Sequence, residues 1–317
     1  MLLRCQFLFV ILYMIEEILP WDIALKFNRF QENLYPNKNA RGVRLMAELP
    51  EITKYAKQMR ETLRGKIIAG LELLQEKCAN VAADDFQSRI VNAGVVDVYH
   101  KGKWIITKLD NEENILLSLG MGADLLYFEE GAEMPEKYQV KLQFCDGSGY
   151  TVRFWWFGKF LLVPNDELST DSNTKDIAMD PFDEGFTLDY FTDLLKGKRT
   201  QIKSFLMNQK NVGGIGNMYM HDILFKAGLH PQKKISDMES VEIEKVYGSI
   251  MEILNQSREK GSFSYEKDFF GEEGGFSMDD FSVGYKEEQP CPVCGEEIVS
   301  IKTGSTSTFI CPRCQKL

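Results

Sequence analysis

Cys291-Pro-Val-Cys294 and Cys311-Pro-Arg-Cys314 are two Cys-x-x-Cys pairs separated by sixteen residues, and they decide how the end of this chain folds. Each pair presents two sulfurs to one metal ion, and a hairpin between the pairs brings the four sulfurs together. The spacing therefore predicts a tetrahedral zinc site in a zinc ribbon. Because four sulfur ligands leave no open coordination position, we expect the zinc to be structural and not catalytic.

The bulk composition is that of a globular protein from a reducing compartment. The chain has 317 residues, 44% of them hydrophobic and 26% charged, which is enough for two domains. The other cysteines, Cys5, Cys78 and Cys145, show no pairing pattern, and this excludes a disulfide scaffold. The formal charge of -10 gives no global sign of nucleic-acid binding, so such binding would need a local basic face.

Residues 1–45 differ in pattern from the rest of the chain. The apolar run at 7–14 has eight residues, too few to span a bilayer, and no small-residue cleavage site follows it. We expect this segment to be an extension outside the fold, translated from an upstream start, with Met46 as the functional initiator. The alternative is an additional element that packs on the first domain.

Residues 46–165 predict one helix followed by many short strands. Apolar residues at helical spacing run from Leu49 to Leu63, and Pro50 suits the first turn of a helix. Strand patterns follow at 66–74, 90–98, 104–109, 115–119, 125–128, 140–144 and 150–163. Short strands with glycine and asparagine turns indicate a β-sandwich or a barrel.

The second half of the chain is predicted to be mainly helical. Residues 166–183 are polar and predict a linker, and helical patterns follow at 188–196, 202–208, 218–227 and 237–260. Ser236 and Glu239 are predicted to form a capping box for the last helix. The fold class is therefore α+β, with an N-terminal β-sandwich domain that has a leading helix, a helical domain at 184–262, a glycine-containing mobile loop at 263–282, and the zinc ribbon at 283–317.

Several short stretches carry candidate chemistry. Ala47 and Glu48 place a small residue and a carboxylate at a helix start, where an acidic residue usually only complements the helix dipole. Lys103, at a predicted hairpin, could meet a phosphate or only solvent. Met121 lies between two glycines, and the aromatic run that begins at Phe154 is assigned to the core by default.

A glycine turn separates the second and third predicted helices. Gly213, Gly214 and Gly216 allow backbone amides to approach an anion, and Asn217 adds a side-chain donor at the start of the next helix. A phosphate is the expected partner, and a turn that serves only for packing is the open alternative.

Taken in order, these motifs resemble the formamidopyrimidine-DNA glycosylase and endonuclease VIII family of DNA-repair enzymes. The resemblance covers residues 46–317 and rests on the opening at 46–51, Lys103, the loop at 120–122, the segment 209–231 and the zinc ribbon at 290–315. It implies a helix-two-turn-helix DNA-binding domain at 184–262 and a lesion pocket that includes the loop at 263–282.

The resemblance also implies a function, the removal of oxidised bases from duplex DNA followed by strand cleavage through a Schiff base. Residue 47 would supply the attacking amine, Glu48 would transfer protons, and Lys103 would steady the phosphate and charge near the sugar. Met121 would wedge into the gap left by the flipped base. The other DNA contacts implied are Trp155, Trp156, Phe157, Lys159, Gly214, Gly216, Asn217, Lys302 and Thr306.

Three departures from the family pattern bear on this chemistry. Ala47 stands where the family has proline, and its amine can form an imine only if initiation at Met46 and removal of that methionine expose it. Trp155 and Trp156 replace two arginines, one of which contacts the base opposite the lesion, so stacking could replace hydrogen bonding there. The family arginine that grips phosphates aligns with Thr306, or is displaced near Lys302.

Three functions remain open after this reading. The first is a glycosylase with lyase activity, and the second is a catalytically degenerate member that binds damaged DNA without cleaving it. The third, an interaction module unrelated to repair, accounts only for the zinc ribbon. We expect a monomer that binds damaged double-stranded DNA and no membrane, carries structural Zn²⁺, and works in the bacterial cytoplasm at the nucleoid.

Overall fold

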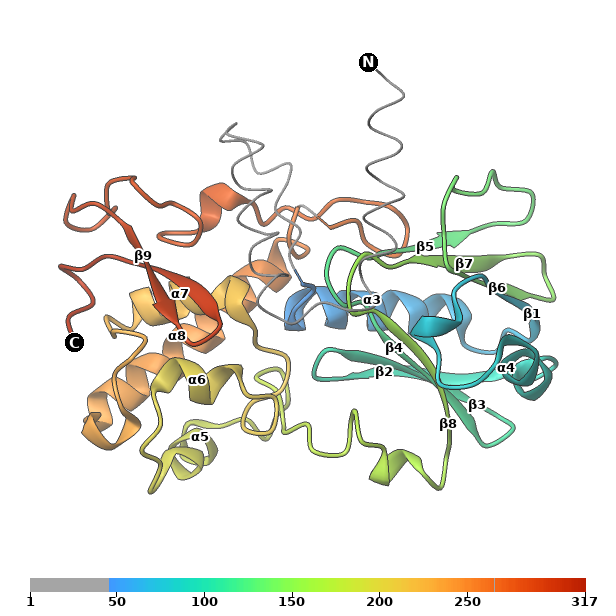
Figure 1. Ribbon diagram of the computed structural model, residues 1–317, viewed down its shortest axis with the longest axis horizontal. Helices are drawn as coiled ribbons and strands as arrows, with labels where there is room; N and C mark the ends of the chain where they lie inside the picture. Colours follow the sequence, from blue (N-terminus) through green and yellow to red (C-terminus); the bar gives the residue numbers. More distant parts are fainter. Residues whose placement is uncertain (1–45, 265) are drawn as a thin grey trace, which may run out of the picture. The chain divides into compact units, whose positions relative to one another are not determined.

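The structure, a computed structural model, describes residues 46–264 and 266–317, so the predicted extension at 1–45 lies outside the described residues. The described residues belong to one compact unit, Arg44–Leu317. Its helices are α3 (Leu49–Leu63), α4 (Ala83–Ile90), α5 (Leu188–Leu195), α6 (Ile202–Met207), α7 (Asn217–Lys226) and α8 (Ser240–Glu259). The predicted α+β class is confirmed (Figure 1).

The strands form two four-stranded antiparallel sheets and one two-stranded hairpin. One sheet has the order β1-β6-β7-β5, with β1 (Ile68–Leu73), β5 (Asp124–Phe128), β6 (Val140–Phe144) and β7 (Gly149–Arg153). The other has the order β2-β3-β4-β8, with β2 (Val95–Lys101), β3 (Trp104–Leu109), β4 (Glu113–Ser118) and β8 (Lys159–Pro164). Apolar residues of both sheets share one core, which confirms the β-sandwich.

Helix α3 joins the two halves of the fold. Pro50 lies in its first turn, where a missing N–H costs nothing, and its apolar stripe is buried. Ile52 and the later apolar residues belong to the core of the sheets, whereas Leu49 belongs to the core of the helical domain. The start of α3 is therefore fixed where the two cores meet.

Three details of the predicted elements were wrong. The sequence predicted a strand at 90–98, but Ile90 is the last residue of helix α4 and strand β2 begins only at Val95. The run at 150–163 is two strands in different sheets, because the chain turns at Phe157, which has φ +58°. Helix α8 is capped by Glu239 with Glu242, and Ser236 lies before it in a short 3-10 helix.

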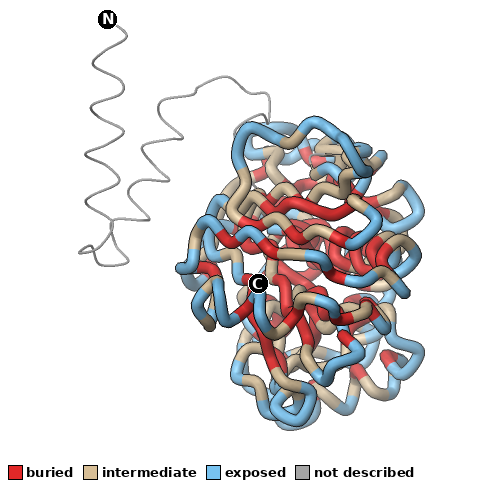
Figure 2. Tube along the Cα trace, turned by 90° about the vertical axis from the view of Figure 1, so that its right-hand side faces the viewer, coloured by how far each residue is buried: buried red, intermediate tan, exposed pale blue. Residues whose placement is uncertain are grey.

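The helical domain is built around α7. Residues Met218 to Phe225 of this helix are all buried, so it lacks the polar stripe of a surface helix. The zinc hairpin, β9 (Val299–Thr303) and β10 (Thr306–Ile310), packs against it, and Phe225 shares a small core with Ile298. Buried segments run through the interior beneath the exposed loops (Figure 2).

The predicted loop at 263–282 lies against α3 and the first sheet. Asp268 accepts from Gln58 Nε2 at 2.8 Å and pairs with Lys54 Nζ at 2.9 Å, and the carbonyl of Phe269 accepts from the amide of Tyr127 at 2.7 Å. The mobility of this loop stays a prediction. Within the described part of the chain, no helix combines the length and apolar character needed to cross a bilayer.

Candidate active site and metal centre

Glu48 is buried at the junction between α3 and the glycine turn. Its Oε2 accepts from the amide of Gly216 and its Oε1 from the amide of Met218, both at 2.8 Å. Burial raises the pKa of Glu48 above its ordinary value, while the Lys103 ammonium and these amides oppose the rise. A carboxyl group with a raised pKa can both donate and accept a proton closer to neutral pH.

The glycine turn approaches the Glu48 carboxylate. Gln209 shapes the turn, because its Oε1 accepts from the amide of Gly214 at 2.8 Å. A Cβ atom at Gly216 would lie 2.2 Å from Glu48 Oε1, so only glycine fits there. The expected contacts of Gly214 and Gly216 with phosphate find no support in this geometry, because both amides already donate to protein oxygens.

Lys103 reaches Glu48 from the turn between β2 and β3. Its Nζ lies 3.9 Å from Glu48 Oε1 and 3.8 Å from Met46 Sδ. The preceding residue, Gly102, has φ +56°, and a Cβ atom there would lie 2.8 Å from Ile177 Cγ2. The tight packing of this turn therefore brings the cation and the carboxylate together, although they are far apart in the sequence.

Ala47 and Met121 lie in neighbouring backbone segments. Ala47 is 3% exposed, and Met46, the residue before it, forms a β-bridge with Met121. Met121 in turn forms a β-bridge with Trp156, whose carbonyl accepts from the Met121 amide at 2.9 Å. The expected nucleophile position, wedge and aromatic segment therefore lie side by side next to Glu48.

Phe154, which begins the aromatic run, packs against the core of the sheets, as the default assignment predicted, but the next three residues are at the surface, where that assignment was wrong. Trp155 is 41% exposed, Trp156 47% and Phe157 65%. The guanidinium of Arg153 lies 4.8 Å from the centre of the Trp155 ring, at cation–π distance. Exposed aromatic rings beside the wedge position form a surface on which a planar group can stack.

The remaining expected DNA contacts are spread over four elements, α7, β8, β9 and β10. Asn217 Nδ2 donates to a carbonyl of β10 at 3.3 Å, and its Oδ1 is buried without a partner among the described residues. Thr306 accepts from a buried lysine, and Lys302 is exposed. Lys159 lies in the sheet domain, where its Nζ donates to Asn173 Oδ1 at 2.8 Å.

Glu51, which supports Glu48, was not among the site residues that the sequence predicted. Glu51 is 2% exposed, and its Oε2 accepts from the amide of Glu48 at 3.0 Å. Its Oε1 accepts from the Tyr219 hydroxyl at 2.6 Å, and burial raises its pKa to about 7. The sequence signals were an acidic residue in a first helical turn, which is common on exposed helices as well, and its position three residues after Glu48, the spacing of a capping box.

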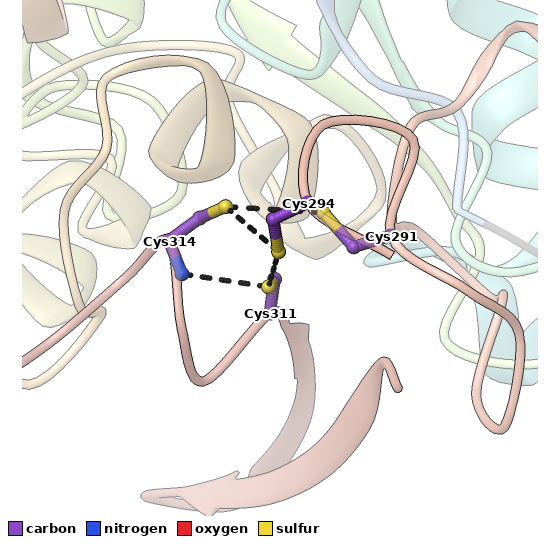
Figure 3. A group of neighbouring side chains, drawn as sticks. All are labelled: Cys291, Cys294, Cys311 and Cys314. Atoms are coloured by element: carbon purple, nitrogen blue, oxygen red, sulfur yellow. Dashed lines mark hydrogen bonds between the residues drawn. The ribbon is translucent and has the colours of Figure 1, made fainter. Parts of the chain in front are cut away.

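The four predicted zinc ligands form one cluster in the described part of the chain (Figure 3). The Sγ–Sγ distance is 3.9 Å for Cys291 and Cys314, 3.4 Å for Cys294 and Cys311, and 3.5 Å for Cys294 and Cys314. Four bonds of about 2.3 Å to a tetrahedral zinc require separations of about 3.8 Å. The cluster fits a structural Zn²⁺, as predicted, which would staple the two Cys-x-x-Cys turns together.

Removal of one ligand should release the metal and destabilise the hairpin. We expect C294A to lose the zinc, because structural sites need all four ligands and contribute folding free energy directly. C145A is the matched control, since Cys145 is exposed and lies outside the cluster. Metal content per chain and the melting temperature are the measurements, and a C294A protein with full zinc content would contradict the assignment.

Comparisons with known proteins place these features in one family. Residues 46–156 match the formamidopyrimidine-DNA glycosylase N-terminal domain, residues 177–267 match the H2TH domain of the same enzymes, and residues 288–317 match the zinc finger found in FPG and IleRS. These matches follow the order of the sandwich, the helices and the cysteine cluster.

Individual relatives align over nearly their whole length. A formamidopyrimidine-DNA glycosylase of Brevibacillus brevis is 30% identical over 275 residues, covering 86% of this chain and 99% of the relative. One from Streptococcus mutans is 31% identical over 277 residues, covering 86% and 100%. Lactococcus lactis Fpg, solved in complex with DNA containing an abasic site, shares the fold with a TM-score of 0.77 at 24% identity, covering 85% of this chain and 100% of that one. The chain therefore belongs to the formamidopyrimidine-DNA glycosylase family.

Proposed function

We propose that this protein is a DNA glycosylase of base-excision repair that removes oxidised bases from duplex DNA and cleaves the strand as an AP lyase. The names of its relatives support the glycosylase activity. The observation that carries the proposal is Glu48, a buried carboxylate that directly follows Ala47 and lies 3.9 Å from Lys103 Nζ. Imine formation at a sugar requires a general acid–base group, a nearby cation and an adjacent nitrogen nucleophile.

In the proposed reaction, the free amine of Ala47 attacks C1′ of the damaged nucleoside. A bond forms between this nitrogen and C1′, the bond from C1′ to the base breaks, and the base leaves with a proton. Glu48 supplies and removes protons as the sugar ring opens to the imine. Loss of a proton from C2′ then expels the 3′ phosphate, and Lys103 steadies the negative charge of the phosphate.

The DNA-binding surface proposed here contains the wedge and the aromatic segment. Met121 fills the gap in the stack, while Trp155, Trp156 and Phe157 offer rings to the base opposite the lesion. Asn217 and Lys302 contact backbone phosphates from the helical domain and the hairpin. Stacking distinguishes little among the four possible opposite bases, because every base has a π-face.

A base-release assay separates this function from a protein that only binds damaged DNA. That alternative is favoured by Ala47 at the nucleophile position and by Trp155 and Trp156. We expect free oxidised base from duplexes carrying the lesion. The rate of base release should vary less than about fivefold with the opposite base, whereas bidentate readout would discriminate by about 1–3 kcal/mol, which is roughly 5- to 150-fold. Tight binding without base release would support the alternative.

A further inference from the structure

Three consecutive aromatic side chains, Trp155, Trp156 and Phe157, lie at the surface between β7 and β8. Their exposed fractions are 41%, 47% and 65%, although large aromatic side chains are normally well covered. The ring centres of Trp156 and Phe157 are 6.1 Å apart, and the rings are tilted by 44°. We call these three residues the aromatic surface. A contiguous exposed apolar group of this kind marks an interaction site.

Backbone contacts hold the aromatic surface in one position. The amide of Met121 donates to the carbonyl of Trp156 at 2.9 Å, and a Cβ atom at Gly120 would overlap that carbonyl oxygen. Phe157 has φ +58°, a conformation that is uncommon outside glycine and that the surrounding contacts must maintain. Because the segment is already ordered, little conformational entropy is lost when a ligand stacks on its rings.

The aromatic surface adjoins the segment that carries the proposed nucleophile. Met46 forms a β-bridge with Met121, and Met121 forms one with Trp156. Neighbouring strands lie about 4.8 Å apart, so the backbone of Trp156 is roughly 10 Å from that of Met46, the residue before Ala47. Stacked nucleotides follow one another about every 3.4 Å along a strand. The ring of Trp156 can therefore reach a base within about three nucleotides of the reacting sugar.

The charges around the aromatic surface disfavour a second DNA strand. The cations among residues 150–160 are Arg153 and Lys159. Both face protein oxygens, because Arg153 Nη1 lies 3.9 Å from Asp124 Oδ2 and Lys159 Nζ donates to Asn173 Oδ1 at 2.8 Å. The formal charge of the chain is -10, and a duplex carries about twice the charge per unit length of a single strand. A single strand is therefore repelled less than a duplex.

Stacking, unlike readout by hydrogen bonds, does not depend on a base pair. A side chain that reads an opposite base through its hydrogen-bonding edge is useful only where that base is present. An aromatic ring stacks on any accessible base, because every base has a π-face. A damaged base in unpaired DNA also leaves its stack without the cost of breaking a pair. Each of these terms favours unpaired DNA as a ligand of this surface.

We propose that the protein acts on oxidised bases in unpaired DNA, in single strands and bubbles, as well as in duplexes, and that Trp155 and Trp156 then stack on a base of the damaged strand itself. The chemistry at the damaged base rests on the proposed function. Met121 fills the place of the flipped base, and the two indole rings replace the stacking that the absent strand would have supplied.

The affinity for single-stranded DNA tests this inference. With the full chain and an oligonucleotide that carries a stable abasic analogue, the affinities for the single strand and for the matching duplex should agree within about fivefold. W156A should weaken single-strand binding by at least about fivefold, the effect of losing one stacked base, and W156F should restore most of it. L74A, which removes an apolar side chain that is 66% exposed, is the control and should bind like the wild type.

Removal of single bases from the DNA gives a readout that a purely structural role of Trp156 would not change. In the single strand, each base within about three nucleotides of the analogue is replaced in turn by a further abasic analogue. One of these positions, the base that stacks, should weaken binding of the wild type several-fold. W156A should show no loss at that position. Equal losses in the wild type and in W156A would overturn the inference.

Base release separates this inference from the proposed function. In single-turnover assays, the same protein should release an oxidised base from the single strand within about tenfold of its rate on the duplex. If the duplex loses its base and the single strand stays intact, the inference is wrong and the glycosylase assignment stands. If neither DNA loses its base, the proposed function fails and activity on unpaired DNA fails with it, whereas the base-removal measurements still decide whether the aromatic surface binds an unpaired strand.

Discussion

Protein that begins at Ala47 should form a covalent adduct with abasic-site DNA in the presence of borohydride, and protein with one extra residue before Ala47 should form none. An α-amine with a pKa of about 8 is partly unprotonated at neutral pH and can attack the sugar aldehyde. A peptide nitrogen cannot, because its lone pair is delocalised into the carbonyl group. The expected effect is the complete loss of the trapped species on a denaturing gel.

A47P is the informative companion to this experiment. A secondary amine also forms an iminium ion, so a protein that starts with proline should trap as well, and the comparison measures what alanine changes. The extended protein must still bind abasic DNA, which shows that only the chemistry was removed. An adduct of undiminished yield from the extended form would place the nucleophile elsewhere, and mass spectrometry of the linked peptide would identify it.

E48Q should reduce base release by about two to four orders of magnitude, the usual contribution of a positioned proton carrier. The substitution keeps the shape of the side chain but removes the proton transfer. It also turns one backbone amide, of Gly216 or Met218, towards an NH₂ group, and the unsatisfied donor should cost about 1–3 kcal/mol of stability. The rate of base release in single-turnover assays is the measurement.

The matched control is E61Q, on the same helix. The Glu61 side chain is 63% exposed and its closest cation, Lys57 Nζ, lies 4.0 Å away, so E61Q should retain both rate and stability. Binding to an abasic analogue should survive in both variants. Undiminished excision by E48Q would remove Glu48 from the mechanism, whereas loss of binding would point to damage at the junction of α3 and the glycine turn.

The exposed tryptophans and the buried Lys203 differ in how far the sequence could indicate their positions. The exposed tryptophans were recognisable only against the family pattern, because a Phe-Trp-Trp-Phe run is typical of a core. Lys203 gave no signal at all, since Ile202-Lys-Ser reads as part of an ordinary amphipathic helix. Its three threonine partners lie about a hundred residues later in the chain.

Element types were easier to predict than element boundaries. Helix α3 followed from its apolar spacing, which local backbone geometry imposes. Helix α4 was missed because an eight-residue helix gives little periodicity. The break between β7 and β8 was missed because the positive φ of Phe157 occurs at a residue that does not favour it, and packing against the loop at 120–122 holds the turn.

By itself, the sequence determined the zinc site, the α+β class and the order of the family motifs. Each of these depends on the spacing of residues that are close in the chain, and short spacing restricts geometry strongly. Only the tertiary structure decided that the amides of Gly216 and Met218 donate to Glu48, that Tyr219 donates to Glu51, and that Lys203 lies beneath the hairpin. These pairings join distant segments, so they depend on how two cores meet across α3, which no local pattern encodes.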